Sequence, residues 1–186
     1  EPTPDFFSTL ERAILHSIPK PLAVVVCYPS NPTAYVADLD FYKELVPFAK
    51  KHGIFILSDL AYAEVYFDDN PPASILQVPG AMEVAVEFTS MSKTFSMPGW
   101  RMGFAVGNER LIAALARIKS YLDYGAFTPI QVAAIAALPD FDRTLDEAPG
   151  QQLSVTMNPA HAEKLFAGSG HTFQELLALA AYLQAK

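Results

Sequence analysis

The chain has 186 residues, a formal net charge of -7, a pI near 5.0 and 51% hydrophobic residues. This length predicts about one domain, and the hydrophobic content is enough for a sizeable buried core. The acidic balance argues against nucleic acid and anionic membranes, and no apolar run reaches the roughly 18 residues of a membrane span. We therefore expect neither nucleic acid nor a membrane as a partner.

The single cysteine and the first residues bear on the compartment in which the protein is located. Cys27 excludes an intrachain disulfide and fits a reducing compartment, which predicts a cytoplasmic protein. Its place at the end of an apolar run predicts a buried, inert thiol. The start, Glu1 to Asp5, is acidic, lacks an initiator Met and does not resemble a signal peptide. We expect a chain that was processed or cut from a longer one.

The first part of the chain predicts a strand–helix–strand unit. Asp38 is a suitable N-cap for its helix, and Pro47 predicts a kink or an early end of that helix. His52, just before a glycine, is expected to complement the helix dipole. The first strand is a continuous apolar run, typical of a strand buried on both faces. The predicted elements are a helix over 6–17, a strand over 22–28, a helix over 39–51 and a parallel strand over 54–57.

The second part predicts two more strands and two more helices. Asn108 is a candidate N-cap for the first of these helices. Beyond Pro139 the chain is acidic and rich in turns, then helical in pattern, and it carries no recognisable chemistry. We therefore divide the chain into residues 1–138 and a tail of residues 139–186. The predicted elements are strands over 84–88 and 102–106, a helix over 109–121 and a helix from 128 or 129 to 138.

Polar side chains follow three of the predicted strands, where ligands bind in open α/β sheets. They belong to Asn31 after the first strand, to Asp59 and Tyr62 after the second, and to Ser90, Ser92 and Lys93 after the third. Met and Phe around the lysine predict a partly desolvated amine, which would be a nucleophile for a carbonyl. An aldehyde cofactor with a pyridine ring and a phosphate would use the whole set.

Each of these residues also has an ordinary structural interpretation. Asp59 is compatible with a turn cap, Asn31 with a plain turn, Tyr62 with packing, and Lys93 with a solvated loop. The four histidines show no metal-ligand spacing with each other or with the cysteine, so we expect no metal site.

Three motifs, in this order and spacing, resemble the class I/II aminotransferases, which are pyridoxal-phosphate enzymes of fold type I. The alanine and LL-diaminopimelate aminotransferase-like branch is the most similar. The resemblance covers residues 19–138, and it implies an incomplete large domain: a three-layer α/β fold with a mostly parallel sheet and flanking helices. The motifs are Tyr28-Pro29-Ser30-Asn31-Pro32-Thr33, Ser58-Asp59-Leu60-Ala61-Tyr62 and the run from Ser90 to Gly103, which contains Ser-Met-Ser-Lys and Gly-Trp-Arg.

The resemblance implies a role for each motif residue toward pyridoxal 5'-phosphate. Lys93 would be the Schiff-base lysine and would then shuttle a proton. Asp59 would pair with the pyridinium nitrogen, and Tyr62 and Asn31 would bond the ring hydroxyl. Ser90 and Arg101 would hold the phosphate, with Ser92 assisting. The implied reaction moves an amino group between an amino acid and a 2-oxo acid, in an enzyme that is a homodimer at full length.

The sequence also departs from the family pattern. Ala34 stands where the family usually has glycine, and Leu60 where it usually has glutamate. Family members are about twice as long, so the phosphate-binding loop and the substrate-carboxylate arginine are missing, and sheet edges and one face should be exposed.

Three alternatives to an active aminotransferase therefore stay open. The first is a non-catalytic fragment or scaffold that retains the motif. The second is a pyridoxal-phosphate-dependent C–S lyase. The third, a nucleotide-binding domain, is disfavoured because no glycine-rich phosphate loop follows a strand.

Overall fold

The computed structural model describes residues 3–137. The chain divides into two compact units, residues 1–125 and 126–186. The described part of the second unit contains helix α5 (Thr128–Ala137), four of whose alanines are buried. The expected boundary after residue 138 stays a prediction, and the tail of residues 139–186 lies outside the described residues.

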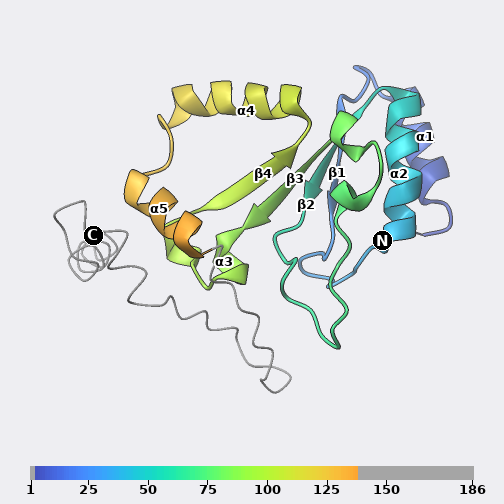
Figure 1. The fold of residues 1–186 in the computed structure, drawn as a ribbon. Helices are drawn as coiled ribbons and strands as arrows, with labels where there is room; N and C mark the ends of the chain where they lie inside the picture. The colour runs from blue at the N-terminus through green and yellow to red at the C-terminus, as the bar shows by residue number, and fades with distance from the viewer. Residues whose placement is uncertain (1–2, 138–186) are drawn as a thin grey trace. The chain divides into compact units, whose positions relative to one another are not determined.

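The first unit is built on a four-stranded sheet in the order β1-β2-β3-β4. Its strands are β1 (Ala23–Cys27), β2 (Phe55–Asp59), β3 (Ala85–Ser90) and β4 (Gly103–Gly107). The first three are parallel, and β4 runs antiparallel to β3, so its arrow points the opposite way in Figure 1. The expected mostly parallel sheet with flanking helices is confirmed.

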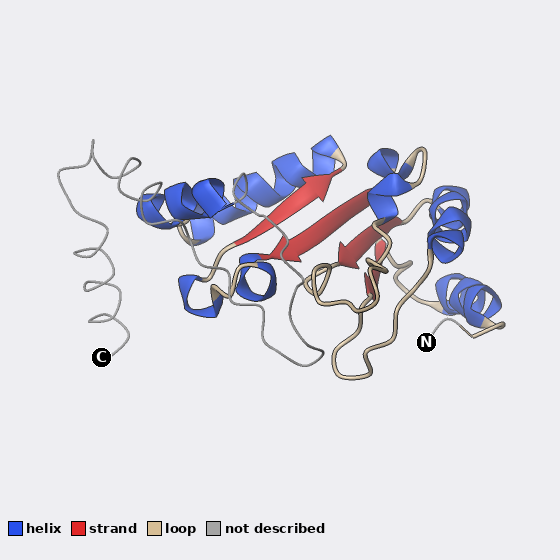
Figure 2. Cartoon of the chain, turned by 60° about the horizontal axis from the view of Figure 1, so that its bottom comes forward, coloured by secondary structure: helices blue, strands red, loops and turns tan. Residues whose placement is uncertain are grey.

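Helices α1 (Phe6–His16) and α2 (Leu39–His52) supply much of the core beside this sheet (Figures 1 and 2). The Asp38 side chain accepts a hydrogen bond of 2.8 Å from the Phe41 amide and caps α2, as expected. Pro47 does not shorten the helix, which ends at Gly53 in the left-handed conformation (φ 61°). The core joins α1, α2, the first three strands and the short helix η1 (Ile75–Gln77).

The remaining elements follow β2. Two further short helices are η2 (Ala81–Glu83) and η3 (Pro98–Trp100), and helix α3 (Met91–Thr94) begins directly after β3. Helix α4 (Glu109–Leu122) is capped by Asn108, whose Oδ1 accepts hydrogen bonds from two backbone amides, as expected. None of the described helices is both long enough and apolar enough to span a bilayer.

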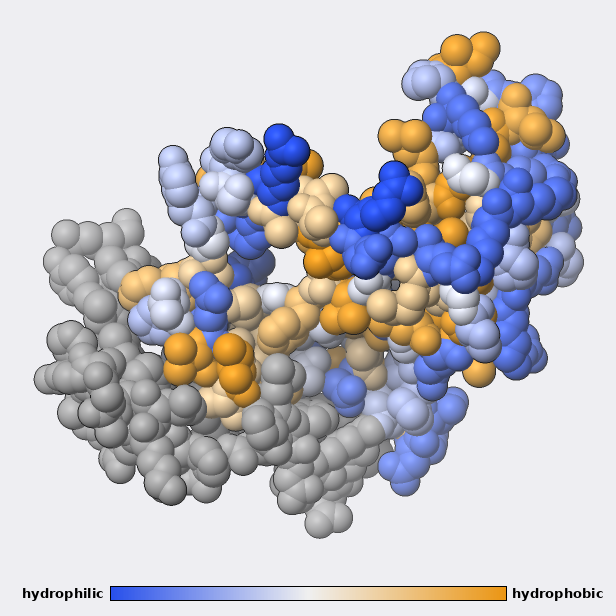
Figure 3. All heavy atoms as spheres, turned by 45° about the horizontal axis from the view of Figure 1, so that its top comes forward, coloured by the Kyte–Doolittle hydropathy of each residue, from blue (hydrophilic) through white to orange (hydrophobic). Residues whose placement is uncertain are grey.

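The expectation that the first strand is buried on both faces is wrong. Strand β1 is an edge strand of the sheet, and Val25 in its centre is 68% exposed. Cys27 at its end is only half-buried, so the expected buried thiol is also wrong. On one face of the molecule, Figure 3 shows apolar residues (orange) reaching the surface among polar ones (blue). The exposure of Val25 on the edge strand β1 agrees with the expected exposure of a sheet edge.

Candidate active site

The sheet topology explains why the motif residues gather. Because β1, β2 and β3 are parallel, their carboxyl ends lie at one edge of the sheet, where Cys27 is in register with Asp59 and Asp59 with Phe88. Strand β4 is antiparallel and therefore begins at this edge, with Gly103 opposite Ser90. All seven candidate residues belong to the strand ends at this edge or to the segments that start or end here.

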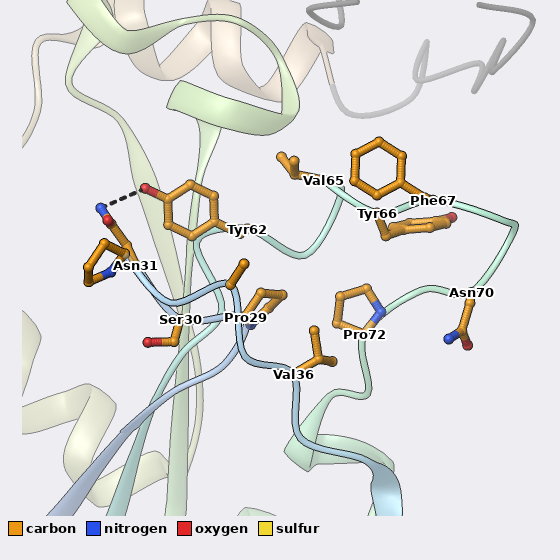
Figure 4. Close-up of a pocket in the computed structure, with 12 residues that line it drawn as sticks. Pro29, Ser30, Asn31, Val36, Tyr62, Val65, Tyr66, Phe67, Asn70 and Pro72 are labelled. Carbon is orange, nitrogen blue, oxygen red and sulfur yellow. Dashed lines mark hydrogen bonds between the residues drawn. The ribbon is translucent and has the colours of Figure 1, made fainter. Parts of the chain in front are cut away.

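Three of the candidate residues are directly connected. Asn31 Nδ2 donates a hydrogen bond of 3.1 Å to the Tyr62 hydroxyl, as the dashed line in Figure 4 shows. Lys93 Nζ lies 5.6 Å from the centroid of the Tyr62 ring. Asn31 lies in the loop after β1, Tyr62 in the segment after β2 and Lys93 in helix α3, so tertiary structure brings the amide, the phenol and the amine together.

The lysine lies in a more open environment than expected. Lys93 is exposed, which contradicts the expected partial desolvation. Its apolar neighbours Met91 and Phe95 are 1% and 6% exposed and pack into the interior. Strand β3 also runs two residues further than predicted, to Ser90, whose Oγ accepts a 3.1 Å hydrogen bond from the Ser92 amide and caps α3.

The other candidate residues make local contacts. Asp59 is half-buried, and its Oδ1 accepts a 3.1 Å hydrogen bond from the Ala61 amide, so it forms the turn cap that was the alternative interpretation. Arg101 is exposed, has a left-handed backbone (φ 53°) and donates from its guanidinium to the Pro98 carbonyl at 2.8 Å. Asp59 keeps further acceptor positions, since a carboxylate has about four.

A pocket of about 440 Å³ opens beside the Asn31–Tyr62 pair. One wall comes from the loop after β1 and the other from the loop between β2 and β3, as Figure 4 shows. No charged side chain is among the lining residues. These are Pro29, Ser30, Asn31, Pro32, Ala34, Val36, Tyr62, Val65, Tyr66, Phe67, Asn70 and Pro72.

Sequence reasoning missed a buried carboxylate behind the site. Glu87 in β3 is 8% exposed and accepts hydrogen bonds from Ser74 Oγ at 2.6 Å, the Ile75 amide at 3.1 Å and Ser58 Oγ at 3.2 Å. It thereby ties β2 and β3 to η1, which follows the pocket loop. Burial, with a smaller effect of the Glu87 charge, raises the pKa of Tyr42 well above its usual value. The available signal was one acidic residue inside an otherwise apolar strand.

The structure gives a reason for the glycine that the family usually has at the position of Ala34. Its φ is 56°, in the left-handed region that glycine adopts easily and alanine at a cost of roughly 1–2 kcal/mol. We expect Ala34→Gly to leave the free energy of unfolding unchanged or to raise it by up to about 1 kcal/mol, since glycine also has a more flexible unfolded state. Ala13→Gly, inside α1, should lower it by about 1 kcal/mol. Urea titrations of both variants measure this, and equal losses would contradict it.

Metal ligands are not gathered in this region. Within residues 3–137 no cluster of three or more His, Cys, Asp or Glu side chains is arranged to hold a metal ion. Cys27 is a free thiol.

Comparison with known proteins identifies relatives of this chain. The family model described as "Aminotransferase class I and II" matches residues 6–159. A putative aminotransferase, AatC, of Rhizobium meliloti is 76% identical over 74% of this chain and 34% of its own length. The glutamate-pyruvate aminotransferase AlaC of Escherichia coli is 56% identical over 72% of this chain and 32% of its own length.

Further matches include an LL-diaminopimelate aminotransferase and solved structures. The LL-diaminopimelate aminotransferase of Natranaerobius thermophilus is 50% identical over 72% of this chain and 34% of its own length. An apo structure of BacF from Bacillus subtilis matches with a TM-score of 0.61 and 44% identity, over 64% of this chain and 32% of that one. The chain thus spans about a third of the length of the curated relatives it matches.

Proposed function

This chain belongs to the aminotransferase class I and II family, and from that premise we propose that it forms the central part of the cofactor-binding domain of a pyridoxal-phosphate-dependent aminotransferase. The proposed reaction moves an amino group between an amino acid and a 2-oxo acid. The observation that carries the proposal is the Asn31–Tyr62–Lys93 group, in which motif residues from two loops and from helix α3 lie together.

The functional groups of the side chains at this edge of the sheet match the chemical groups of pyridoxal 5'-phosphate. The amine of Lys93 suits the aldehyde, the carboxylate of Asp59 suits the ring nitrogen, and the Asn31–Tyr62 pair suits the ring hydroxyl. The hydroxyls of Ser90 and Ser92 and the guanidinium of Arg101 suit the phosphate. When bound, the cofactor would supply an electron sink for charge that develops on the substrate's Cα.

The proposed work of the chain's own residues follows from their chemistry. Lys93 Nζ would take the proton from the substrate's Cα and later return it, which is general acid–base catalysis by an exposed amine. The Asp59 carboxylate would keep a proton on the ring nitrogen. Asn31 donates to the Tyr62 hydroxyl and so fixes the orientation of that phenol.

The proposal extends to the whole protein only through its relatives. Because the chain covers about a third of their length, the substrates, a homodimeric assembly and a cytoplasmic location are part of the proposal. The family supports the homodimer, and the free cysteine supports a reducing compartment.

An assay of the products separates amino-group transfer from a C–S lyase activity and from a non-catalytic fragment. The chain is incubated with pyridoxal phosphate, a 2-oxo acid, and L-glutamate or L-alanine labelled on the amino nitrogen. The amino acids formed are identified by mass spectrometry. We expect label in the amino acid derived from the 2-oxo acid. Release of ammonia, thiol and a 2-oxo acid from cystathionine without an amino acceptor would indicate a C–S lyase. No product from either mixture would indicate a non-catalytic fragment.

A further inference from the structure

We propose that Glu87 is a positioning residue for the candidate site: its carboxylate holds both ends of the loop over residues 60–73 and so fixes where that loop presents the Tyr62 hydroxyl. This inference rests on the proposed function and adds to it a residue that touches neither cofactor nor substrate. Glu87 lies in β3 and is 8% exposed. Because a buried carboxylate needs partners to offset its lost hydration, the groups that it bonds indicate its role.

The carboxylate joins the two segments that flank this loop. Oε2 accepts hydrogen bonds from Ser58 Oγ at 3.2 Å and from the Ile75 amide at 3.1 Å, and Oε1 accepts one from Ser74 Oγ at 2.6 Å. Ser58 precedes the loop, near the end of β2, whereas Ser74 and Ile75 follow it, at the start of η1. Ser58 is also in register with Glu87 across the sheet. One side chain thereby closes the loop at its base.

The loop depends on contacts at its ends because its own backbone is irregular. Residues 60–73 form turns and bends but no helix or strand. At the first end, the Leu60 amide donates a 2.8 Å hydrogen bond to the Phe88 carbonyl of β3. Just inside the loop, the Val65 amide donates to the Tyr62 carbonyl at 3.1 Å, which keeps Tyr62 in a turn. Fixing such a segment costs conformational entropy, and contacts at its ends help to offset that cost.

Tyr62 carries the effect from the loop to the candidate site. Its hydroxyl accepts the 3.1 Å hydrogen bond from Asn31 Nδ2, and its ring centroid is 5.6 Å from Lys93 Nζ. The proposed bond between this phenol and the ring hydroxyl of pyridoxal phosphate depends on the position of one oxygen atom, and a hydrogen bond weakens steeply as its geometry worsens. A shift at the base of the loop should therefore lower the affinity for the cofactor ring.

The competing explanation is that Glu87 stabilises the fold without affecting the site. Its hydrogen bonds are charge-assisted and largely buried, so their loss lowers stability under either explanation. Mild substitutions are therefore needed. Ser58→Ala and Ser74→Ala remove the bond at the first and the second end of the loop and keep the carboxylate, and Glu87→Gln removes the charge and keeps the shape. Ser74 Oγ also caps η1, so Ser74→Ala is compared with Ser58→Ala, which leaves that cap intact.

Binding of pyridoxine 5'-phosphate to the 186-residue chain tests the inference without catalysis. This probe has the ring hydroxyl and the phosphate but no aldehyde, so the Lys93 amine does not react with it. Affinity is measured from the fluorescence of the probe. Tyr62→Phe should weaken binding about two- to tenfold, which is the effect of one lost hydrogen bond.

The three variants of the network should weaken binding of the same probe. We expect a loss of about twofold or more in each of Ser58→Ala, Ser74→Ala and Glu87→Gln. Ile14→Val, a substitution in the core on α1 with a similar cost to stability, should leave the affinity unchanged.

The Tyr62→Phe background shows whether the effect passes through the phenol. Substitutions that act through one shared contact are not additive, whereas independent ones are. We therefore expect Ser58→Ala, Ser74→Ala and Glu87→Gln to cause no further loss of affinity once the phenol is absent. A general loss of structure would lower the affinity equally in both backgrounds.

The outcomes separate failure of this inference from failure of the proposed function. Unchanged affinity in the network variants or in Tyr62→Phe, or equal losses with and without the Tyr62 hydroxyl, would overturn the positioning role of Glu87 and leave the cofactor site standing. If the parent chain bound no probe, the proposed function would fail, and this inference with it.

Discussion

Replacing Lys93 with alanine is expected to lower the rate of amino-group transfer by about 10²- to 10⁴-fold or more, because the proposed proton acceptor and donor at the substrate's Cα is removed. The same variant should lose the visible absorbance that the parent chain gains when pyridoxal phosphate is added. Rates come from the labelled-product assay and absorbance from a titration with the cofactor.

Two further variants separate the amine from its charge. Lys93→Arg retains a cation beside the Tyr62 ring but has no nucleophilic amine, so it should fail as completely as Lys93→Ala. Lys119→Ala removes an exposed lysine that is paired with Asp123, and it should behave as the parent. Parent-like transfer or absorbance in Lys93→Arg would show that a charge at this position is sufficient, against the proposed role.

Replacing Glu87 with alanine is expected to lower the free energy of unfolding by about 2–4 kcal/mol. The change removes the acceptor for Ser58, Ser74 and the Ile75 amide, and the Ser58 and Ile75 donors would be left buried without a partner for these bonds. Because a small domain has only about 5–15 kcal/mol of stability, part of the population would unfold at moderate temperature. Urea unfolding followed by circular dichroism measures the loss.

The controls for Glu87 test whether buried hydrogen bonding is the cause. Glu87→Gln keeps the shape and one acceptor oxygen, so it should recover part of the loss. Glu83→Ala removes an exposed carboxylate that pairs with Lys50 at 2.9 Å, and it should cost at most about 1 kcal/mol. A loss in Glu87→Ala no larger than in Glu83→Ala would contradict the role of this network.

The strand–helix–strand unit was predictable because its apolar runs and caps are local signals. Asp38, Gly53 and Asn108 end or begin helices through contacts with residues a few positions away. The end of β3 was missed because Thr89 and Ser90 are polar, whereas their place in the strand depends on pairing with Phe104 and Gly103. Such pairing is a long-range contact that local polarity does not report.

The environment of Lys93 could have been predicted from helical spacing. Met91 and Phe95 are four residues apart and share one face of the turn, and both are buried. Lys93, two residues from each, therefore projects away from them. The apolar residues near Lys93 in the sequence predicted a desolvated amine. Their four-residue spacing instead buries Met91 and Phe95 and leaves Lys93 exposed to solvent.

The pocket and the Glu87 network could not be derived from periodicity. The pocket joins the loop after β1 to a loop some thirty residues further along the chain, and its lining residues fall within 29–36 and 62–72. The gathering of motif residues at one edge was predictable, because parallel strands place their carboxyl ends together. Which of them touch was not, since the loops after the strands determine it.

The most direct test of the account is borohydride reduction of the chain in the presence of pyridoxal phosphate, followed by peptide mass mapping. The account predicts a phosphopyridoxyl adduct on Lys93 that is absent from Lys93→Ala. No adduct, or labelling spread over other lysines such as Lys43 and Lys51, would contradict the claim that this chain builds a site for the cofactor.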